Sequence, residues 1–336
     1  MILVTGSTGL VGAHLLYRLV SNNEKVRAIY RSAHKLDNVK NVFSTYTDNY
    51  KNLFDAIEWV QADILDIPLL SDTFNDISYV YHCAAFVSFE PDKYHLLRQT
   101  NIEGTANIVN LCLSKNIKKL CYVSSIATIG NTLNNESITE NTNWNPEADN
   151  SVYAITKYGA EMEVWRATQE GLNAVVINPG VILGGGIWRY GSGSLFKKAH
   201  KGLKYYTSGT IGLVYIEDVV SIMIQLLKSN IVNERFILVA ENWTYKNFLQ
   251  TLAKSVNTNI PKKLASKRLL NIIWKLDWLK HKATGKRRQL TKQIAYSLSS
   301  ETDYNSDKIK EILNYTFKDV NESIIKVGSQ YLKQVK

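Results

Sequence analysis

Three glycines directly behind an apolar run constrain the fold of this chain more than any other feature. Residues 2–5 read Ile-Leu-Val-Thr, Gly6, Gly9 and Gly12 follow at intervals of three, and residues 10–20 carry apolar side chains at helical spacing. This order predicts a buried strand, a tight turn and a helix that begins at the turn. Glycine lets the peptide N–H groups approach an anion, which the helix N-terminus also attracts. We therefore expect a phosphate-binding turn at residues 5–12.

The first half of the chain alternates short apolar runs with longer amphipathic ones, the pattern of parallel strands joined by crossover helices. We expect strands at residues 2–5, 26–31, 59–62, 79–82, 120–124 and 174–178, and helices at 10–20, 53–57, 70–74, 94–114, 153–169 and 217–228. We assign no further element to the long polar segment 32–55. Beyond residue 180 the spacing becomes irregular and glycine-rich.

These patterns predict an α/β fold with a doubly wound parallel sheet and a smaller substrate-binding lobe. The sheet is expected in residues 1–180, with residues 205–240 returning to it, and the lobe in residues 181–336. With 336 residues, the chain is long enough for two such units.

Cysteine, histidine and hydropathy patterns narrow the class of protein. Cys83, Cys112 and Cys121 have no CxxC spacing, which argues against a disulfide framework and for a reducing compartment. The six histidines are scattered, with no pair at metal-ligand spacing, so we expect no bound metal. We interpret His82, on a predicted buried strand, as a hydrogen-bonded core residue. The glycine motif leaves no room for a signal peptide, and no apolar run approaches the roughly 18 residues of a membrane span. We expect a cytoplasmic protein.

The formal charge of +10 arises in one segment, residues 262–292. Apolar residues, among them Trp274 and Trp278, alternate there with the charges, so the segment fits a solvated helix face, a pocket for an anionic substrate, or peripheral contact with an acidic membrane. No nucleic-acid-binding motif accompanies it, and we expect no nucleic acid partner. The charged residues are Lys262, Lys263, Lys267, Arg268, Lys275, Lys280, Lys282, Lys286, Arg287, Arg288 and Lys292, against Asp277 alone.

Tyr153 and Lys157 are the strongest candidates for chemistry. They lie four residues apart at the start of a predicted helix, so both side chains lie on one face. A nearby ammonium favours the phenolate and should lower the pKa of Tyr153, so that the phenol can exchange a proton with a substrate oxygen. Ser125, at the end of the fifth strand, can donate a hydrogen bond to the same oxygen.

Several further motifs occur in an order that resembles the extended short-chain dehydrogenase/reductase family, which includes epimerases and dehydratases. The resemblance spans roughly residues 1–240. The motifs are Thr5-Gly6-x-x-Gly9-x-x-Gly12, Asp63-Ile64, His82-Cys83-Ala84-Ala85, Asn101-x-x-Gly104-Thr105, Ser124-Ser125, Tyr153-x-x-x-Lys157, Asn178-Pro179-Gly180 and residues 214–219.

The resemblance implies a Rossmann fold that binds a nicotinamide cofactor, with Lys157 also on its ribose. Ser125 is preferred to Ser124 because it lies five residues before Gly130, as the family's serine lies before its glycine. Asp63 and Ile64 should border the adenine, Ala84 and Ala85 the nicotinamide-side ribose, and Asn101 is expected to support the cofactor or a water. The cofactor-binding candidates are Gly6, Thr8, Gly9, Leu10, Val11, Gly12, Arg31, Asp63, Ile64, Cys83, Ala84, Ala85, Asn101, Val123, Tyr153, Lys157, Pro179, Gly180 and Val181.

Arg31, at the end of the second strand, favours NADP(H), with NAD(H) as the alternative. NAD-dependent enzymes usually carry an acidic residue there, whereas a guanidinium matches the 2'-phosphate of NADP. Ser32 and Lys35 could assist. A solvated arginine at a strand end is the other interpretation.

The resemblance favours the reductase branch, similar to dihydroflavonol reductases and 3-beta-hydroxysteroid dehydrogenases. In that branch a ketone or aldehyde is reduced, or the alcohol oxidised. Residues 126–128 lack the acidic pair of the dehydratases, so dehydration is disfavoured. Sugar-nucleotide epimerisation with NAD is the alternative, and a non-catalytic regulatory module is the second.

The substrate is expected to be a small molecule, and the chain a monomer or homodimer. An apolar pocket for the substrate is predicted from Phe86, Val87, Ile126, Ile182, Trp188 and Tyr190, while the basic segment suits an acidic group instead.

Overall fold

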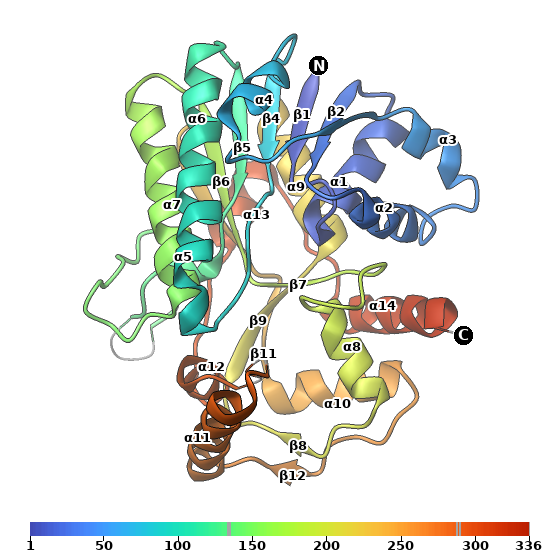
Figure 1. Cartoon of the computed structure of the whole chain (residues 1–336). Helices are drawn as coiled ribbons and strands as arrows, with labels where there is room; N and C mark the ends of the chain where they lie inside the picture. Colours follow the sequence, from blue (N-terminus) through green and yellow to red (C-terminus); the bar gives the residue numbers. More distant parts are fainter. Residues whose placement is uncertain (133–135, 287, 289, 336) are drawn as a thin grey trace.

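Seven parallel strands form the main sheet of the computed structural model, which describes residues 1–132, 136–286, 288 and 290–335. The spatial order is β10-β6-β5-β4-β1-β2-β3 (Figure 1). From the boundary between β1 and β4, the strands follow one another outward in chain order on both sides: β1 to β3 on one side and β4 to β10 on the other. Ligands of such sheets bind at this boundary, at the carboxyl ends of the strands. The strands are β1 (Ile2–Thr5), β2 (Val26–Tyr30), β3 (Glu58–Gln61), β4 (Tyr79–His82), β5 (Lys119–Val123), β6 (Ala174–Pro179) and β10 (Glu234–Leu238). The six strands predicted are present within a residue or so at their ends.

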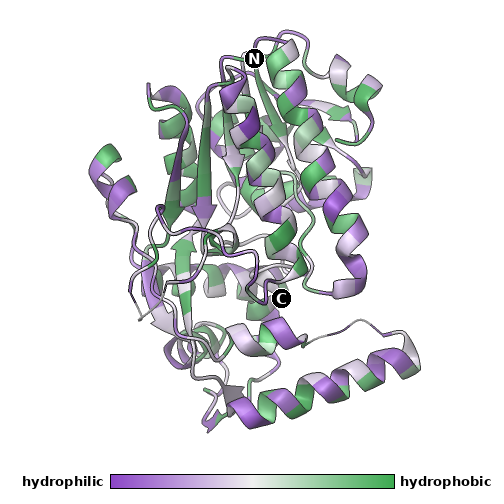
Figure 2. Ribbon diagram, turned by 90° about the vertical axis from the view of Figure 1, so that its left-hand side faces the viewer, coloured by the Kyte–Doolittle hydropathy of each residue, from purple (hydrophilic) through white to green (hydrophobic). Residues whose placement is uncertain are grey.

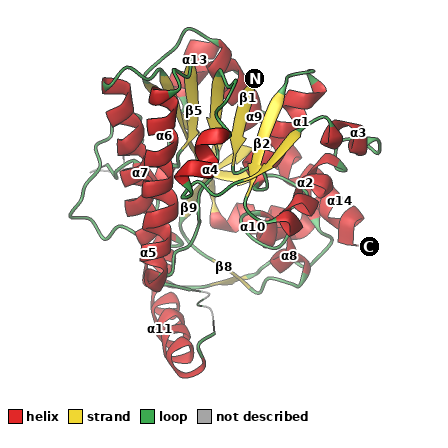
Figure 3. Cartoon of the chain, turned by 45° about the horizontal axis from the view of Figure 1, so that its top comes forward, coloured by secondary structure: helices red, strands yellow, loops and turns green. Residues whose placement is uncertain are grey.

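Helices cover both faces of this sheet (Figures 1 and 3). On one face α1 (Leu10–Ser21), α2 (Leu36–Phe43) and α9 (Ile216–Lys228) pack on Val4 and its neighbours; on the other, α4 (Ile67–Asp72), α6 (Gly104–Ser114) and α7 (Val152–Gln169) pack on Leu3. Successive strand residues point to opposite faces, so a strand covered on both sides must be apolar throughout. This explains the continuous apolar run of residues 2–4.

Several connections differ from the sequence prediction. Segment 32–55, to which only a helix at 53–57 was assigned, folds into the 3-10 turn η1 (Ala33–Lys35), α2 and α3 (Tyr50–Asp55). Helix α2 forms because Val39, Val42 and Phe43 share one buried face, a stripe too short to stand out among polar residues. The helix predicted at 70–74 is α4, which begins earlier because the Asp66 side chain accepts a hydrogen bond from the Leu69 N–H group and caps it.

The helix predicted at 94–114 is interrupted. It consists of the 3-10 turn η2 (Pro91–Lys93), α5 (Tyr94–Leu97), the π-helix η3 (Arg98–Glu103) and α6. A π-helical turn inside a helix often marks a functional site. Here it carries Asn101.

The smaller lobe contains a three-stranded sheet, in the order β11-β9-β7, and the two-stranded pair β12-β8. Its strands are β7 (Val181–Leu183), β8 (Tyr205–Tyr206), β9 (Thr210–Tyr215), β11 (Glu241–Thr244) and β12 (Lys263–Leu264). Its helices are α8 (Gly193–His200), α10 (Tyr245–Ser255), α11 (Lys267–Thr284), α12 (Lys292–Ser297) and α14 (Val320–Val335), whereas α13 (Asp307–Leu313) lies against the main sheet.

The two parts of the chain are interleaved. After β9, the chain returns to the main sheet as α9 and β10, and α13 packs on β10. One apolar core runs from β1 and α1 to Phe196 of α8, Phe248 of α10 and Ile324 of α14. The division at residue 180 stays a prediction.

Within the described ranges, no helix is long and apolar enough to cross a membrane. The same residues contain no cluster of three or more His, Cys, Asp or Glu side chains arranged to hold a metal ion.

Candidate functional site

The glycine-rich loop between β1 and α1 is built so closely that side chains cannot fit at two of its glycines. Gly6 has φ +64°, and a Cβ there would lie 2.5 Å from the Ala84 nitrogen at the end of β4. A Cβ on Gly12 would lie 2.3 Å from the Gly6 carbonyl oxygen. At Gly9, by contrast, the nearest atom would be 3.3 Å away. Gly6 and Gly12 therefore close the turn, while Gly9 leaves its outer side accessible to a ligand.

The N-terminus of α1 fits the pyrophosphate of a dinucleotide. Among the described residues no side chain caps this helix, and its first turn carries no acidic residue. Its free N–H groups and dipole therefore favour an anion beside Thr8, Leu10 and Val11. The loop is fixed to β2 by Ser7, whose hydroxyl donates a 2.6 Å hydrogen bond to the Ile29 carbonyl.

Arg31 and Asp63 meet at the ends of β2 and β3. The Arg31 guanidinium lies 3.7 Å from the Asp63 carboxylate, and both side chains are solvent-accessible. Such an exposed pair contributes under about 1 kcal/mol, so Arg31 can turn towards a phosphate at little cost. The neighbouring Ile64 is buried and packs on Gly104, where a Cβ would lie 2.4 Å from its Cδ1.

The end of β4 is anchored through His82, which is fully buried. Its Nδ1 is 2.6 Å from the Thr5 hydroxyl and its Nε2 is 3.0 Å from the Thr105 hydroxyl. These bonds make it the hydrogen-bonded core residue that the sequence indicated, and they hold β4 beside the glycine-rich loop. Cys83, Ala84 and Ala85 follow directly, and burial raises the pKa of the Cys83 thiol to about 12, so Cys83 is a packing residue rather than a nucleophile.

Two buried histidines predict acid sensitivity of the fold. Burial lowers the pKa of His14 to about 4 and that of His82 to about 3. The unfolded chain takes up these protons below about pH 6.5 and the folded chain does not, so stability is present above that pH and is lost as the pH falls. We expect each histidine to cost about 2 to 3 kcal/mol between pH 6.5 and 4.5. Urea unfolding at a series of pH values measures this.

His14→Gln provides the control for that experiment. His14 bonds the Tyr46 hydroxyl at 2.6 Å and the Gly185 carbonyl at 3.1 Å, and glutamine can keep polar contacts without titrating. The variant should show a flatter stability profile below pH 6.5. A slope equal to that of the unaltered chain would show that His14 is not responsible.

Ser125, Tyr153 and Lys157 come together at the carboxyl end of β5 and the start of α7. The Lys157 ammonium is buried and donates to the Tyr122 hydroxyl at 2.6 Å and to the Val123 carbonyl at 2.9 Å. Tyr153, one turn earlier, hydrogen bonds with Ser125. The helix begins at this point because Ser151 caps it, its hydroxyl accepting from the Ala154 N–H group at 3.1 Å.

The electrostatics of this group differ from the sequence prediction. Burial raises the pKa of Tyr153 to about 12, and the hydrogen bond with Ser125 opposes this shift only in part. Burial also lowers the pKa of Lys157 to about 7, a shift that Glu161 and Cys83 partly oppose. The predicted lowering of the tyrosine pKa by lysine is absent among the described contacts, because the ammonium is directed to Tyr122 and Val123. Lys157 itself titrates near neutral pH.

Asn101 holds the site together from the π-helix η3. Its side-chain oxygen accepts from the Phe86 N–H group at 2.7 Å, and its amide donates to the Phe86 carbonyl at 3.0 Å and to the Thr156 hydroxyl at 3.1 Å. The residue thereby joins the loop after β4 to helix α7. These bonds use the groups that were expected to support a cofactor or water.

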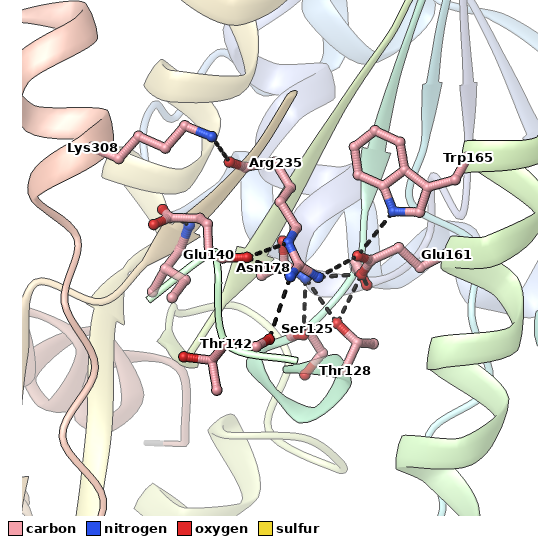
Figure 4. Close-up of polar contacts among 11 residues, drawn as sticks. Ser125, Thr128, Glu140, Thr142, Glu161, Trp165, Asn178, Arg235 and Lys308 are labelled. Atoms are coloured by element: carbon pink, nitrogen blue, oxygen red, sulfur yellow. Dashed lines mark hydrogen bonds and ion pairs between the residues drawn. The ribbon is translucent and has the colours of Figure 1, made fainter. Parts of the chain in front are cut away.

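A buried polar network lies behind Ser125 and joins four elements (Figure 4). At its centre is Glu161 of α7, two turns beyond Tyr153 and fully buried, which accepts from Ser124 at 2.6 Å and from Thr128 at 2.8 Å. The Asn178 amide donates to the same carboxylate at 2.9 Å, and the Arg235 guanidinium forms a 3.3 Å ion pair with it.

The network holds the backbone of Ser125. The Ser125 carbonyl accepts from the Asn178 amide at 3.1 Å and from the Thr128 hydroxyl at 2.9 Å, while the Ser125 side chain caps η4 (Ile126–Thr128). Ser124 has its hydroxyl bound to Glu161. The Ser125 side chain, with Tyr153 as its neighbour, is therefore the serine better placed for a ligand.

The predicted substrate residues lie in different places. Phe86 and Val87 follow β4, and Phe89 of the same loop packs edge-on against Tyr153, with ring centroids 5.4 Å apart. Ile126 follows Ser125 directly, and Ile182 lies in β7, packed against the main core. Val87 is 54% exposed and Phe89 is 38% exposed. The loop that contacts the Tyr153 ring therefore exposes apolar side chains.

Trp188 and Tyr190 contact other elements of the fold. Trp188 packs edge-on against Phe196 and Tyr331, between α8 and α14. The Tyr190 hydroxyl accepts from Asn38 of α2 at 2.6 Å, and the same amide reaches the Thr8 carbonyl of the glycine-rich loop at 3.4 Å. Tyr190 is thereby linked through Asn38 to the glycine-rich loop. Among the contacts of the described residues, neither Trp188 nor Tyr190 is joined to Ser125, Tyr153 or Lys157.

The remaining cofactor candidates are backbone positions at the strand ends. Val123 ends β5, Pro179 ends β6, and Val181 begins β7. A Cβ on Gly180 would lie 2.5 Å from the Gly212 carbonyl, so this glycine allows β6 to turn against β9. Arg287 of the basic segment lies outside the described residues.

Sequence reasoning missed Tyr122, Glu161 and Arg235. Glu161 had a signal: it follows Lys157 by four residues on the face that carries Tyr153. No sequence signal pointed to Tyr122 or Arg235, because their partners lie in distant parts of the chain and reach them only in the folded protein.

Comparison with known proteins agrees with this geometry. The model of the NAD dependent epimerase/dehydratase family matches residues 2–239. The chain is 25% identical over 272 residues to sterol demethylase protein B of Methylococcus capsulatus, covering 80% of this chain and 78% of that protein. It is 30% identical over 181 residues to a putative dihydroflavonol 4-reductase of Synechocystis sp., covering 54% and 49%.

A solved structure has the same fold. UDP-glucose 4-epimerase of Thermotoga maritima, determined with UDP-glucose, superposes with a TM-score of 0.76 at 19% identity, over 100% of this chain and 99% of that one. The family match covers the glycine-rich loop, the Ser125–Tyr153–Lys157 group and strand β10. This chain therefore belongs to the NAD dependent epimerase/dehydratase family and is an NAD(P)-binding enzyme of the extended short-chain dehydrogenase/reductase type.

Proposed function

We propose that the protein is an NADP(H)-dependent oxidoreductase that reduces a ketone or aldehyde, or oxidises the corresponding alcohol. The observation that carries this proposal is the pairing of the Tyr153 hydroxyl, at the start of α7 and one turn from Lys157, with the Ser125 hydroxyl just after β5. One hydroxyl can donate a proton to the carbonyl oxygen of the substrate, while the other donates a hydrogen bond to the same oxygen. The similarity to a putative dihydroflavonol 4-reductase supports the reductase assignment.

Each residue of the group has a defined part in the reduction. A bound nicotinamide cofactor supplies the hydride that adds to the carbonyl carbon. Ser125 donates a hydrogen bond to the carbonyl oxygen as its negative charge grows. Tyr153 transfers its phenolic proton to that oxygen, which leaves a phenolate and completes the alcohol. Lys157, when protonated, stabilises the phenolate until a proton from solvent restores the phenol.

The surroundings favour a substrate with an apolar body. Val87 and Phe89 are exposed on the loop beside Tyr153, and Ile126 follows Ser125. Apolar walls with few polar groups bind ligands by burial of apolar surface and orient them by the polar ones. Here Ser125 and Tyr153 would provide the orientation.

NADP(H) is the proposed cofactor because Arg31 ends β2. We expect Arg31→Ala to weaken NADPH binding about tenfold or more and to leave NADH binding within about twofold, since only NADPH carries the phosphate that a guanidinium pairs with. Fluorescence titration with both cofactors measures the two dissociation constants. Lys40→Ala, an exposed cation further along the same segment, is the matched control. Equal affinity of the unaltered protein for both cofactors would contradict the assignment.

Sugar-nucleotide epimerisation with NAD is the second candidate, favoured by the similarity to a UDP-glucose 4-epimerase. A panel of ketones, aldehydes and nucleotide sugars, followed by NADPH absorbance, separates the two reactions. Consumption of exchangeable NADPH with a carbonyl compound supports the reductase. Tightly retained NAD, with interconversion of nucleotide sugars and no net change in absorbance, would overturn it.

A further inference from the structure

Helix α11 lies at the edge of the smaller lobe with one long face uncovered (Figures 1 and 3). Ser266 caps its start and Gly285, with φ +64°, ends it, so the 18 residues form a defined element. Leu270 is the one buried residue of the helix. It packs in a small cluster with Ala265 and with Ala295 of α12. The helix is thus attached along one side only.

The uncovered side carries an apolar stripe. Ile272, Leu276 and Leu279 are 56%, 58% and 55% exposed. Their spacing of four and three residues puts them on one face of a helix, and at about 100° per residue that face lies away from Leu270. Large apolar side chains are normally buried when a protein folds. A continuous exposed row of them therefore indicates a surface that binds a partner, a ligand or a membrane.

Cations border this stripe on both sides. Arg268 and Lys275 lie along one edge and Lys280 along the other, with Lys267 and Lys282 near the ends. The Lys282 ammonium lies 4.4 Å from the centre of the Trp278 ring. Asp277, the acidic residue of the helix, is on the attached side, 3.8 Å from Arg288. Figure 2 shows hydrophilic and hydrophobic residues mixed along this helix at the bottom of the molecule.

We propose that α11 binds the surface of an anionic phospholipid membrane, lying in the plane of the interface. The apolar stripe enters the boundary between headgroups and acyl chains, while the lysines and Arg268 on its edges reach the lipid phosphates with their long side chains. Each cation near an anionic leaflet strengthens binding about fivefold. The charges prevent the helix from crossing the bilayer.

Charge complementarity favours a lipid surface over a second copy of this chain. A symmetric pairing through the stripe would bring the flanking cations of two helices together, and like charges at an interface oppose association. A nucleic acid would attract the cations but leave the stripe in water. An anionic bilayer satisfies both features at once.

The test uses the full chain and sedimentation with sucrose-loaded vesicles. We expect the protein to sediment with vesicles of phosphatidylcholine containing phosphatidylglycerol, and not with phosphatidylcholine alone, with binding that weakens as salt rises. Leu276→Ser/Leu279→Ser should lower the partition coefficient about tenfold or more. Lys275→Ser/Lys280→Ser should lower it about 25-fold on anionic vesicles.

Ile325→Ser is the matched control, because Ile325 is a helical residue of α14 and is 53% exposed. It should bind vesicles as the unaltered protein does, and circular dichroism of all variants checks that they are folded. Equal binding to neutral vesicles would overturn the proposal, as would binding insensitive to the α11 substitutions. Dimerisation abolished by Leu276→Ser/Leu279→Ser, without vesicle binding, would instead assign the stripe to an interface between copies.

Discussion

Tyr153→Phe is expected to lower the turnover number by a factor of about a hundred to ten thousand, while the dissociation constant for NADPH changes less than about twofold. General acid–base catalysis contributes rate factors of this size, and phenylalanine has no proton to give. The ring itself is kept, so its packing on Phe89 at 5.4 Å between centroids is preserved. Steady-state kinetics with a carbonyl compound that the panel shows to be a substrate, together with a cofactor titration, measure both quantities.

Tyr158→Phe is the matched control for this variant. Tyr158 lies on the same helix, and its ring stacks on Trp144 with centroids 4.5 Å apart. Loss of its hydroxyl should leave turnover nearly unchanged. If Tyr153→Phe and Tyr158→Phe had equal, small effects, Tyr153 would be excluded as the proton donor and the proposed reaction would lose its acid.

Glu161→Gln is expected to lower the free energy of unfolding by about 3 kcal/mol and to reduce turnover as well. Glu161 is fully buried, and its carboxylate faces the Arg235 guanidinium at 3.3 Å. Removal of the carboxylate leaves the partly buried Arg235 guanidinium without its charged partner, although it keeps its hydrogen bonds to the Glu140 and Thr142 carbonyls. Breaking a buried ion pair in this way typically costs about 3–5 kcal/mol. The Arg235 side chain is 21% exposed, and this access to solvent places the expected value at the lower end.

The effect on turnover follows from the position of Ser125. Thr128 and Asn178 bind both the Glu161 carboxylate and the Ser125 carbonyl, so a weaker network lets η4 shift. The chemical step needs Ser125 in a fixed position to donate to the substrate oxygen, whereas cofactor binding does not. A less fixed Ser125 should therefore slow the chemical step more than it weakens cofactor binding. We therefore expect kcat to fall while the NADPH dissociation constant stays close to its original value.

Two further variants distinguish this effect from the loss of an ordinary ion pair. Glu163→Gln removes a partly exposed partner of Arg166, at 3.0 Å on the same helix, and should cost under about 1 kcal/mol. Glu161→Gln/Arg235→Met removes both buried charges and should recover part of the lost stability. A double variant less stable than Glu161→Gln would contradict a penalty from the unpaired arginine. Unfolding by urea and kcat should be measured on all three.

The family and the positions of six main strands along the chain were accessible from local pattern. Residues 2–12 predict strand, turn and helix because glycine spacing and apolar period act within a dozen residues. The Tyr153–Lys157 pair was found for the same reason, since one helical turn fixes its geometry. The structure adds that Gly6 and Gly12 leave no room for a Cβ, which gives the glycine spacing its physical cause.

Two segments show where local pattern fails. Helix α2 was missed because its three buried residues are few and the rest of the segment is polar. Trp188 and Tyr190 were predicted to line the substrate pocket because they follow a cofactor-facing segment, and this stays a prediction; local pattern did not report that Trp188 packs on Tyr331 and that Tyr190 bonds Asn38. Their partners lie more than a hundred residues away, and no periodicity reports such contacts.

The electrostatics of the site also depend on the whole fold. Lysine near tyrosine suggests a lowered phenol pKa, but burial dominates: it raises the pKa of Tyr153 and lowers that of Lys157. Burial is a property of packing between strands and helices that are distant in sequence.

By itself, then, the sequence determined the strand–turn–helix at residues 2–21, the parallel α/β sheet and the presence of Ser125, Tyr153 and Lys157, because each depends on spacing within one or two elements. Only the tertiary structure decided that Glu161, Asn178 and Arg235 meet behind Ser125, that Lys157 is held by Tyr122, and that one face of α11 is left uncovered. These features arise where elements far apart in the chain pack together or fail to, and packing at that range is set by the fold as a whole.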